Sequence, residues 1–398
     1  MAFNLANPDS LLVPESLEDE IVNSMDAKVF RRILLHGFKL EVSDISFQEG
    51  MPVIIKKNNL VFRITRSYLQ RATIKNIVSV VHNAQEGDDS ALTTIMQGNP
   101  SNLTYSYKVP IPGGHEGIRY RVNVLREGER GVSLVMRLNK EDIFDLDQIG
   151  LSEEHLIYKN MFPTKGLNLV TGSVDSGKTT LLYACLKHFI LNSPRSAFID
   201  TYESPIEGNL RDLPSKFEVF NKKVSQMAVP WAVPSFAAGI TESLRRNADI
   251  ILTGEVRTPD EVNGVINGVM QTGKLILGTM HTDNTSMSVN RMIYALNNSS
   301  EAEVKSKVYD LLSSLNMVVS QKLLETVNMK RTAVNETFIV TKEIRDTLQA
   351  LPIDRVAREI KGIMVEQKAT IVDNARKRLE AGIISEQVFD EFQASYSY

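Results

Sequence analysis

The sequence predicts an α/β protein of two domains, a small α+β domain with an antiparallel sheet followed by a larger domain built on a parallel sheet. Three observations lead to this. The chain has 398 residues, and a single core rarely grows beyond roughly 250–300 residues. Short alternating strands fill much of residues 45–138. From residue 166 onward apolar strands alternate with helical stretches, which is the pattern of βαβ units.

The first domain is expected over residues 21–139, after a flexible lead over residues 1–20. Apolar residues at helical spacing predict a first helix over 25–37 that ends at Gly37, and a second helix over 68–83. Alternating runs between turn residues predict the strands. These cover 45–47, 52–56, 60–64, 103–108, 120–125 and 131–138.

A linker is expected over residues 140–155, followed by the second domain over 156–398. Its first strand, 166–171, runs into a glycine-rich turn and a helix over 179–191. Further apolar strands are predicted over 196–200, 250–253 and 275–279. After Ser299 the chain is expected to be mainly helical, so that about 300–398 form C-terminal helices with one strand-like insert over 336–340.

Composition excludes several classes of protein. The 45 basic and 48 acidic residues give a net charge of −3, so binding to nucleic acid or lipid through bulk charge is not expected. The one cysteine, Cys185, excludes an intrachain disulfide. The first 24 residues carry acidic residues and no Lys or Arg, unlike a signal peptide. No apolar run approaches the about 18 residues of a transmembrane helix, so we expect a cytoplasmic chain.

A glycine-rich segment gives the strongest functional signal. Residues 172–179 read GSVDSGKT and match G-x-x-x-x-G-K-[ST] in full. The backbone N–H groups of such a loop face phosphate oxygens, its lysine adds a positive charge, and its threonine hydroxyl is a ligand for Mg²⁺. This chemistry predicts hydrolysis of ATP or GTP. The candidate nucleotide-binding residues are Gly172, Ser173, Val174, Asp175, Ser176, Gly177, Lys178, Thr179 and Thr180.

The second half of such a site is an apolar strand that ends near an acid. Residues 249–255 read DIILTGE and supply one, with Gly254 at the strand end and Glu255 directly after it. A carboxylate at this place orients or deprotonates the attacking water. Glu255 is therefore the candidate catalytic base.

Four segments in this order resemble one family, the ATPases of type II and type IV secretion systems. They resemble most its PilT-like branch and, within it, the DotB/TraJ-type ATPases of Dot/Icm secretion and plasmid conjugation. The segments are the loop at 172–179, TYESPIE at 201–207, DIILTGEVR at 249–257 and TGKLILGTMHT at 272–282. The resemblance implies an N-terminal PAS-like domain, a RecA-like ATPase domain with a helical C-terminal tail, and ATP with Mg²⁺ as cofactors.

The resemblance also implies roles for single residues. Glu203 and Glu255 lie near the γ-phosphate and the water, Thr179 and Glu203 bind the metal, and His281 senses the nucleotide. Lys274 stands where retraction-type members have a histidine, which favours a role other than pilus retraction. The C-terminal segments 320–324, 336–345 and 381–385 resemble the helical tail of the family.

In the first domain, Arg121 and Arg137 match the segments that carry arginine fingers in the family. A fixed guanidinium stabilises charge on a departing phosphoryl group. The alternative is that both arginines are strand residues paired with surface acids. In the first case they reach the phosphates only when a domain or a neighbouring copy closes over the site.

We expect a homohexamer that turns ATP hydrolysis into domain rotation, with an inner-membrane platform or coupling proteins as partners and peripheral membrane association through them. Sequence-specific nucleic-acid binding is not expected. The alternatives are a motor for pilus retraction or assembly, a RecA-like ATPase stimulated by nucleic acid, and a nucleotide-gated scaffold with little turnover.

Overall fold

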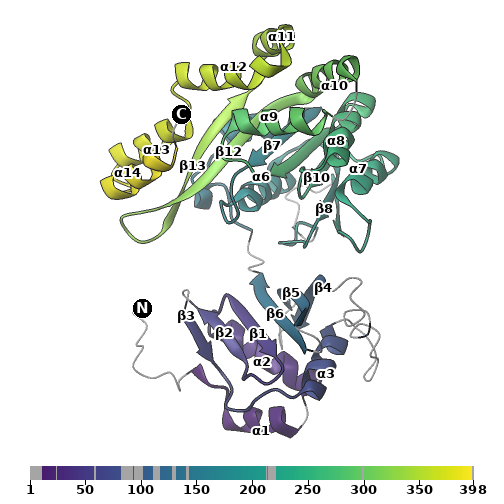
Figure 1. Cartoon of the computed structure of the whole chain (residues 1–398), viewed down its shortest axis with the longest axis vertical. Coiled ribbons are helices and arrows are strands. Elements are labelled where there is room, and N and C mark those ends of the chain that lie inside the picture. Colours follow the sequence, from purple (N-terminus) through teal and green to yellow (C-terminus); the bar gives the residue numbers. More distant parts are fainter. Residues whose placement is uncertain are drawn as a thin grey trace. The chain divides into compact units, whose positions relative to one another are not determined.

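The chain forms two compact units, Met1–Glu141 and Asp142–Tyr398, in the computed structural model (Figure 1). The structure describes residues 11–23, 25–57, 60–81, 93, 102–110, 117–127, 131–139, 143–211, 213, 221–297 and 300–396. The linker expected over 140–155 begins outside these residues. Its described part contains a short 3-10 helix over Asp147–Ile149.

The first unit is an antiparallel sheet with helices packed on it. The strands lie in the order β3-β2-β1-β6-β5-β4, and each neighbouring pair is antiparallel. Their bounds are β1 Asp44–Gln48, β2 Ile54–Lys57, β3 Leu60–Arg63, β4 Asn102–Pro110, β5 Gly117–Glu127 and β6 Gly131–Asn139. The helices are α1 Glu15–Asn23, α2 Ala27–Lys39 and α3 Arg71–Val81. All the strands predicted for this domain are confirmed.

Two expectations for this unit are wrong. Residues 11–20, expected to belong to a flexible lead, are instead part of the folded unit, because Leu11, Val13 and Leu17 are buried in the core. The first helix does not end at Gly37 but continues to Lys39. Gly37 lies inside α2 where the helix faces β1: a Cβ there would lie 2.4 Å from the Cδ1 of Ile45, so a larger residue would require this side chain to shift. The glycine therefore lets the helix approach the sheet.

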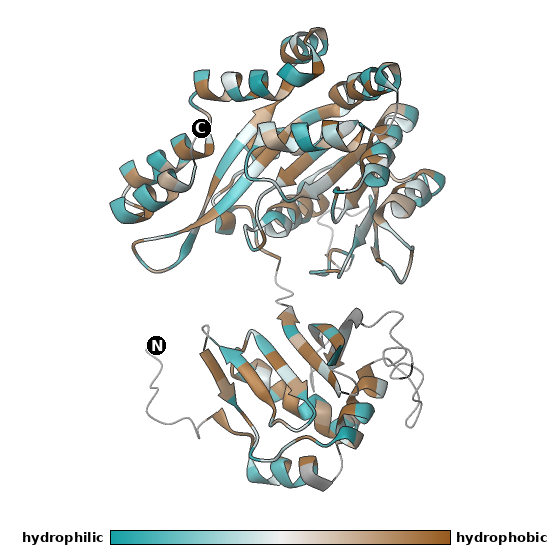
Figure 2. Ribbon diagram, viewed as in Figure 1, coloured by the Kyte–Doolittle hydropathy of each residue, from teal (hydrophilic) through white to brown (hydrophobic). Residues whose placement is uncertain are grey.

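The second unit has a mixed sheet in the order β13-β12-β7-β11-β10-β8-β9. All neighbours are parallel except β12 and β13. The bounds are β7 Gly166–Thr171, β8 Ala197–Glu203, β9 Lys222–Ala228, β10 Ile250–Thr253, β11 Leu275–Met280, β12 Leu315–Glu325 and β13 Arg331–Ile339. Every residue of β7, β10 and β11 is buried, as expected for strands covered on both faces. Figure 2 shows hydrophobic colouring along the centre of this sheet.

Helices cover both faces of the second sheet. Buried residues of α5 and α6 pack on one face, and those of α7 to α12 pack on the other. Two more helices, α13 and α14, pack on the outer part of the hairpin β12–β13. The bounds are α5 Leu156–Met161, α6 Lys178–Asn192, α7 Phe236–Arg245, α8 Pro259–Thr272, α9 Thr285–Ala295, α10 Glu301–Ser314, α11 Lys342–Ala350, α12 Ile353–Glu366, α13 Ile371–Glu380 and α14 Glu386–Ser395. Of the helices in the described part of the chain, none has the length and hydrophobicity that a membrane crossing requires.

The C-terminal region has the predicted helices, and the predicted strand-like insert lies mostly in β13, but a second strand is present that the sequence did not predict. Residues 315–325 form β12, which pairs with the phosphate-loop strand β7 on one side and with β13 on the other. The segment 320–324, expected in a helical tail, is thus part of the central sheet. The helices α11 to α14 that follow agree with the prediction.

Candidate functional site

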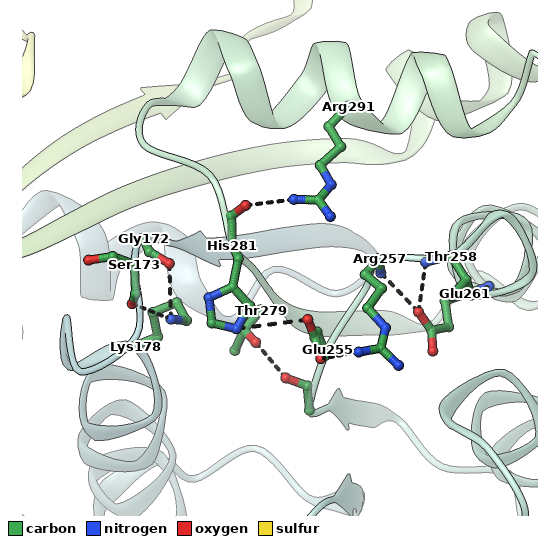
Figure 3. Close-up of polar contacts among 11 residues, drawn as sticks. Gly172, Ser173, Lys178, Glu255, Arg257, Thr258, Glu261, Thr279, His281 and Arg291 are labelled. Carbon is green, nitrogen blue, oxygen red and sulfur yellow. Dashed lines mark hydrogen bonds and ion pairs between the residues drawn. The ribbon is translucent and has the colours of Figure 1, made fainter. Parts of the chain in front are cut away.

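The phosphate loop joins β7 to α6 through a turn that requires unusual backbone angles. Gly172, Asp175 and Gly177 have φ values of 148°, 60° and 81°, the region in which glycine is favoured. The α6 helix begins at Lys178 directly after Gly177, so its unpaired N–H groups face the loop. The Lys178 Nζ donates to the carbonyl oxygens of Gly172 (3.0 Å) and Ser173 (2.7 Å), as Figure 3 shows. Burial lowers the pKa of Lys178, and the nearby Glu255 carboxylate opposes this shift.

A residue that the sequence prediction missed supports the loop from the hairpin. The Gln321 side chain on β12 is buried, and its Nε2 donates to the Ser176 carbonyl (2.7 Å). A Cβ at Gly172 would lie 2.3 Å from the Gln321 carbonyl oxygen, and one at Gly177 would lie 2.8 Å from the Gln321 Nε2. The two glycines of the motif therefore also allow the loop to pack directly against β12. The only sequence signal was a glutamine within an apolar run.

Changing Gly172 to Ala should damage the site because the new methyl group meets a backbone atom. We expect nucleotide binding to be lost and the protein to be destabilised by about 1–3 kcal/mol, the usual cost of such strain. Thermal unfolding and titration with a fluorescent ATP analogue measure both effects. Gly362→Ala is the control, because no atom lies within 4 Å of a Cβ at this position in α12, and alanine stabilises a helix interior. A Gly172→Ala protein that binds nucleotide normally would contradict the expectation.

Glu255 lies at the carboxyl ends of the parallel strands, together with His281. Its Oε1 is 3.8 Å from the His281 Nε2, and its Oε2 is 3.7 Å from the Arg257 Nη1. The turn that carries Glu255 is fixed to β11 because Thr279 donates a side-chain hydrogen bond to the Gly254 carbonyl. The His281 carbonyl accepts from the Arg291 Nη1 on α9 at 2.8 Å (Figure 3). The structure thus brings together two of the predicted catalytic residues, with the carboxylate partly exposed and able to accept a proton from water.

Glu203 is placed differently, inside a closed network of hydrogen bonds. Its carboxylate is buried and accepts from the hydroxyls of Thr201 (2.6 Å) and Tyr183 and from the Gln226 Nε2 (3.4 Å). Burial raises the pKa of Glu203, and these hydrogen bonds oppose the shift. Three protein donors occupy most of the acceptor positions of this carboxylate, so Glu203 is less available to a metal ion than a carboxylate without such partners. Thr179, half-buried in the first turn of α6, and Glu255 offer the oxygen atoms that suit Mg²⁺.

Removing the Tyr183 hydroxyl by Tyr183→Phe should destabilise the protein by about 1–3 kcal/mol at neutral pH, the cost of leaving a buried acceptor without one of its partners. The tyrosine lowers the pKa of Glu203, so its loss raises the pKa further above the unfolded value. Stability linked to such a raised pKa is present at low pH and is lost as the pH rises through the folded-state pKa. The destabilisation should therefore shrink at mildly acidic pH. Urea unfolding at both pH values tests this, with the exposed Tyr309→Phe on α10 as the control.

The candidate arginine fingers are cross-strand neighbours in the first unit. Arg121 on β5 lies opposite Arg137 on β6, and both residues are exposed. The Arg137 Nε donates to the Asp44 Oδ1 on β1 at 2.9 Å. For Arg137 the alternative of pairing with an acid is therefore observed in this conformation. An exposed pair of this kind contributes little stability, so it does not prevent the arginine from moving to another anion.

Lys274 lies at the other end of the strand that leads to His281. It precedes β11, and its Nζ donates to the Asn247 Oδ1 (3.0 Å) and lies 3.4 Å from the Asp249 Oδ1. Six strand residues separate it from His281, which corresponds to about 20 Å. Lys274 therefore joins the starts of β10 and β11 and does not contact the phosphate loop.

Comparisons with known proteins agree with this geometry. The family model described as "Type II/IV secretion system protein" matches residues 89–376. The type IV pilus retraction ATPase PilT of Pseudomonas aeruginosa is 29% identical over 330 residues, which is 82% of this chain and 86% of that protein. The crystal structure of the Legionella pneumophila ATPase DotB superposes with a TM-score of 0.81 at 25% identity and covers 94% of this chain and 98% of that one. The structure of PilT with bound ADP, 22% identical with a TM-score of 0.73 over 91% of this chain and 96% of that one, has the same fold.

These findings confirm the predicted architecture, an N-terminal antiparallel-sheet domain before a RecA-like domain with C-terminal helices. The strands that lead to the phosphate loop, to His281 and to Glu255 (β7, β11 and β10) are neighbours at the centre of the sheet. The family model covers all three. The chain therefore belongs to the Type II/IV secretion system protein family, as a PilT-like P-loop ATPase.

Proposed function

We propose that this chain is the hexameric ATPase of a type IV secretion or conjugative transfer apparatus and that it converts ATP hydrolysis into rotation between its two units. The observation that carries the proposal is the match to DotB, which extends over both units and nearly the full length of each chain. The partly exposed Glu255 beside His281 supports turnover rather than a purely structural use of nucleotide.

In this proposal, the loop at 172–180 and Lys178 bind the phosphates of ATP. Mg²⁺, held by Thr179 and the phosphates, with Glu203 as a further predicted ligand, neutralises charge on them. Glu255 takes the proton of the attacking water. His281, whose Nε2 is close to the Glu255 carboxylate, responds to the nucleotide. Arg121 and Arg137 belong to the first unit and the phosphate loop to the second. In a ring of copies, a first unit that closes over a phosphate loop brings these arginines to the phosphates.

The partners of such a ring are an inner-membrane platform or the coupling proteins of the transfer system. Peripheral membrane association would then occur through these proteins, on the cytoplasmic side. Pilus retraction is the second candidate, because the similarity to PilT covers most of that protein.

Two measurements test the proposal. Sedimentation with and without a slowly hydrolysed ATP analogue should show a hexamer, and a chain that stays monomeric in both would contradict it. In the source organism, deletion of the gene should abolish transfer of protein or DNA and leave pilus-driven surface movement intact. Loss of movement with normal transfer would favour the second candidate.

A further inference from the structure

One buried carboxylate connects the C-terminal helices to the loop between β11 and α9, residues 281–284, which is called the His281 loop below. Glu336 on β13 has only 2% of its surface exposed. Its Oε1 accepts from the N–H (2.9 Å) and the hydroxyl (2.5 Å) of Thr285, and its Oε2 accepts from the Ile371 N–H (3.1 Å). Thr285 begins α9, four residues after His281, and Ile371 begins α13. A single side chain therefore fixes the end of the His281 loop and the start of a C-terminal helix.

A second set of contacts reaches the same loop from the end of the chain. The Asp283 carbonyl accepts from the hydroxyls of Ser320 (2.9 Å) and Tyr396 (3.3 Å). The Asp283 carboxylate pairs with the Lys322 Nζ at 3.0 Å, and this ammonium group lies 5.6 Å from the centre of the Tyr396 ring. Tyr396 directly follows α14. Burial raises the pKa of its hydroxyl, which therefore remains a donor.

The strand register connects these contacts to the phosphate loop. Ser320 on β12 lies between Thr171, the last residue before the loop, and Glu336 on β13. Gln321, the next residue, holds the Ser176 carbonyl. The hairpin β12–β13 thus contacts the phosphate loop through Gln321 and the His281 loop through Ser320 and Glu336. The helices α13 and α14 pack against the same hairpin.

We propose that Glu336 is a positioning residue for ATP hydrolysis. It fixes the position of the His281 loop relative to Glu255 and couples that position to α13 and α14. Movement of these helices, by a partner bound to them, then changes the distance between His281 and Glu255. The inference rests on the role assigned to His281 under the proposed function.

Glu336→Gln tests this with little change in shape. The amide NH₂ group cannot accept a hydrogen bond, so either Thr285 or Ile371 loses its acceptor. We expect kcat to fall by about 10- to 100-fold, because a small displacement of a group near the reacting atoms lowers the rate by such a factor. KM and nucleotide affinity should be unchanged. Tyr396→Phe should lower kcat by a smaller factor. Tyr309→Phe, exposed on α10, makes the same chemical change away from the loop and should have no effect.

A double-mutant cycle with His281→Ala separates positioning from a general loss of structure. If Glu336 acts through His281, Glu336→Gln has no further effect on kcat once His281 is alanine. An equal loss in both backgrounds would overturn the proposal. If Glu336→Gln does not fold, Tyr396→Phe replaces it in the same cycle.

Hydrogen exchange of nucleotide-free protein gives a readout that does not depend on turnover. Glu336→Gln should speed exchange at residues 281–285 and at the start of α13 while the centre of the sheet stays protected. Unchanged exchange in these segments would contradict the proposal. A wild-type protein without ATPase activity would instead contradict the proposed function, so the two failures are distinguishable.

Discussion

Replacing Glu255 by Gln should remove nearly all ATP turnover and leave nucleotide binding intact. The amide keeps the size of the side chain but cannot take a proton from water, and a positioned general base contributes about 10²- to 10⁴-fold to such reactions. Lys178 and the backbone of the loop, to which the proposed function assigns phosphate binding, are unchanged. The His281 Nε2, 3.8 Å from the carboxylate, loses its charged neighbour, so any coupling between them is lost together with hydrolysis.

Phosphate release and titration with a fluorescent ATP analogue measure the two effects separately. Glu242→Gln is the matched control: this glutamate lies on α7 and pairs with the exposed Arg245, so its loss should change neither. Turnover close to wild type in Glu255→Gln would move the catalytic role to another acid, and the buried Glu203 would be the next candidate. Loss of binding would show that Glu255 supports the loop instead.

The parts of the site whose positions follow from the sequence depend on local patterns. The loop at 172–179 and the strand before it are neighbours in sequence, and glycine, lysine and threonine at fixed spacing define the chemistry without reference to the rest of the fold. The approach of His281 to Glu255 follows from similar logic. Each residue comes just after a buried parallel strand, and the carboxyl ends of such strands meet at one edge of the sheet.

The parts that the sequence did not predict depend on contacts between distant segments. Residues 315–325 form a largely apolar run, which periodicity alone cannot distinguish from a buried helix. Their strand conformation comes from pairing with β7, almost 150 positions earlier. The same long-range pairing places Gln321 under the phosphate loop and Ser320 beside the His281 loop. The burial of Glu203 depends on Tyr183 and Gln226, which no local pattern relates to it.

Replacing Arg121 by Ala should lower kcat by about 10³-fold, the lower end of the range for arginine fingers, with little change in stability. The side chain is exposed, and exposed charges contribute little to folding. Thermal unfolding and steady-state ATPase activity at saturating nucleotide measure both. Arg63→Ala, also exposed and on the edge strand β3 of the same sheet, should leave activity unchanged. Normal turnover in Arg121→Ala would leave this arginine as an ordinary surface residue.

Mixed rings decide whether Arg121 acts on its own copy or on a neighbour. Arg121→Ala copies keep an intact phosphate loop, and Lys178→Ala copies keep an intact arginine, so each protein alone should be inactive. If the arginine acts across the interface, an equal mixture rebuilds complete sites at about a quarter of the interfaces of a head-to-tail ring. ATPase activity should then reappear on mixing. If it acts within one copy, every subunit with a working loop lacks its arginine, and mixing restores nothing. The outcome therefore tests the ring geometry and the arginine role in one measurement.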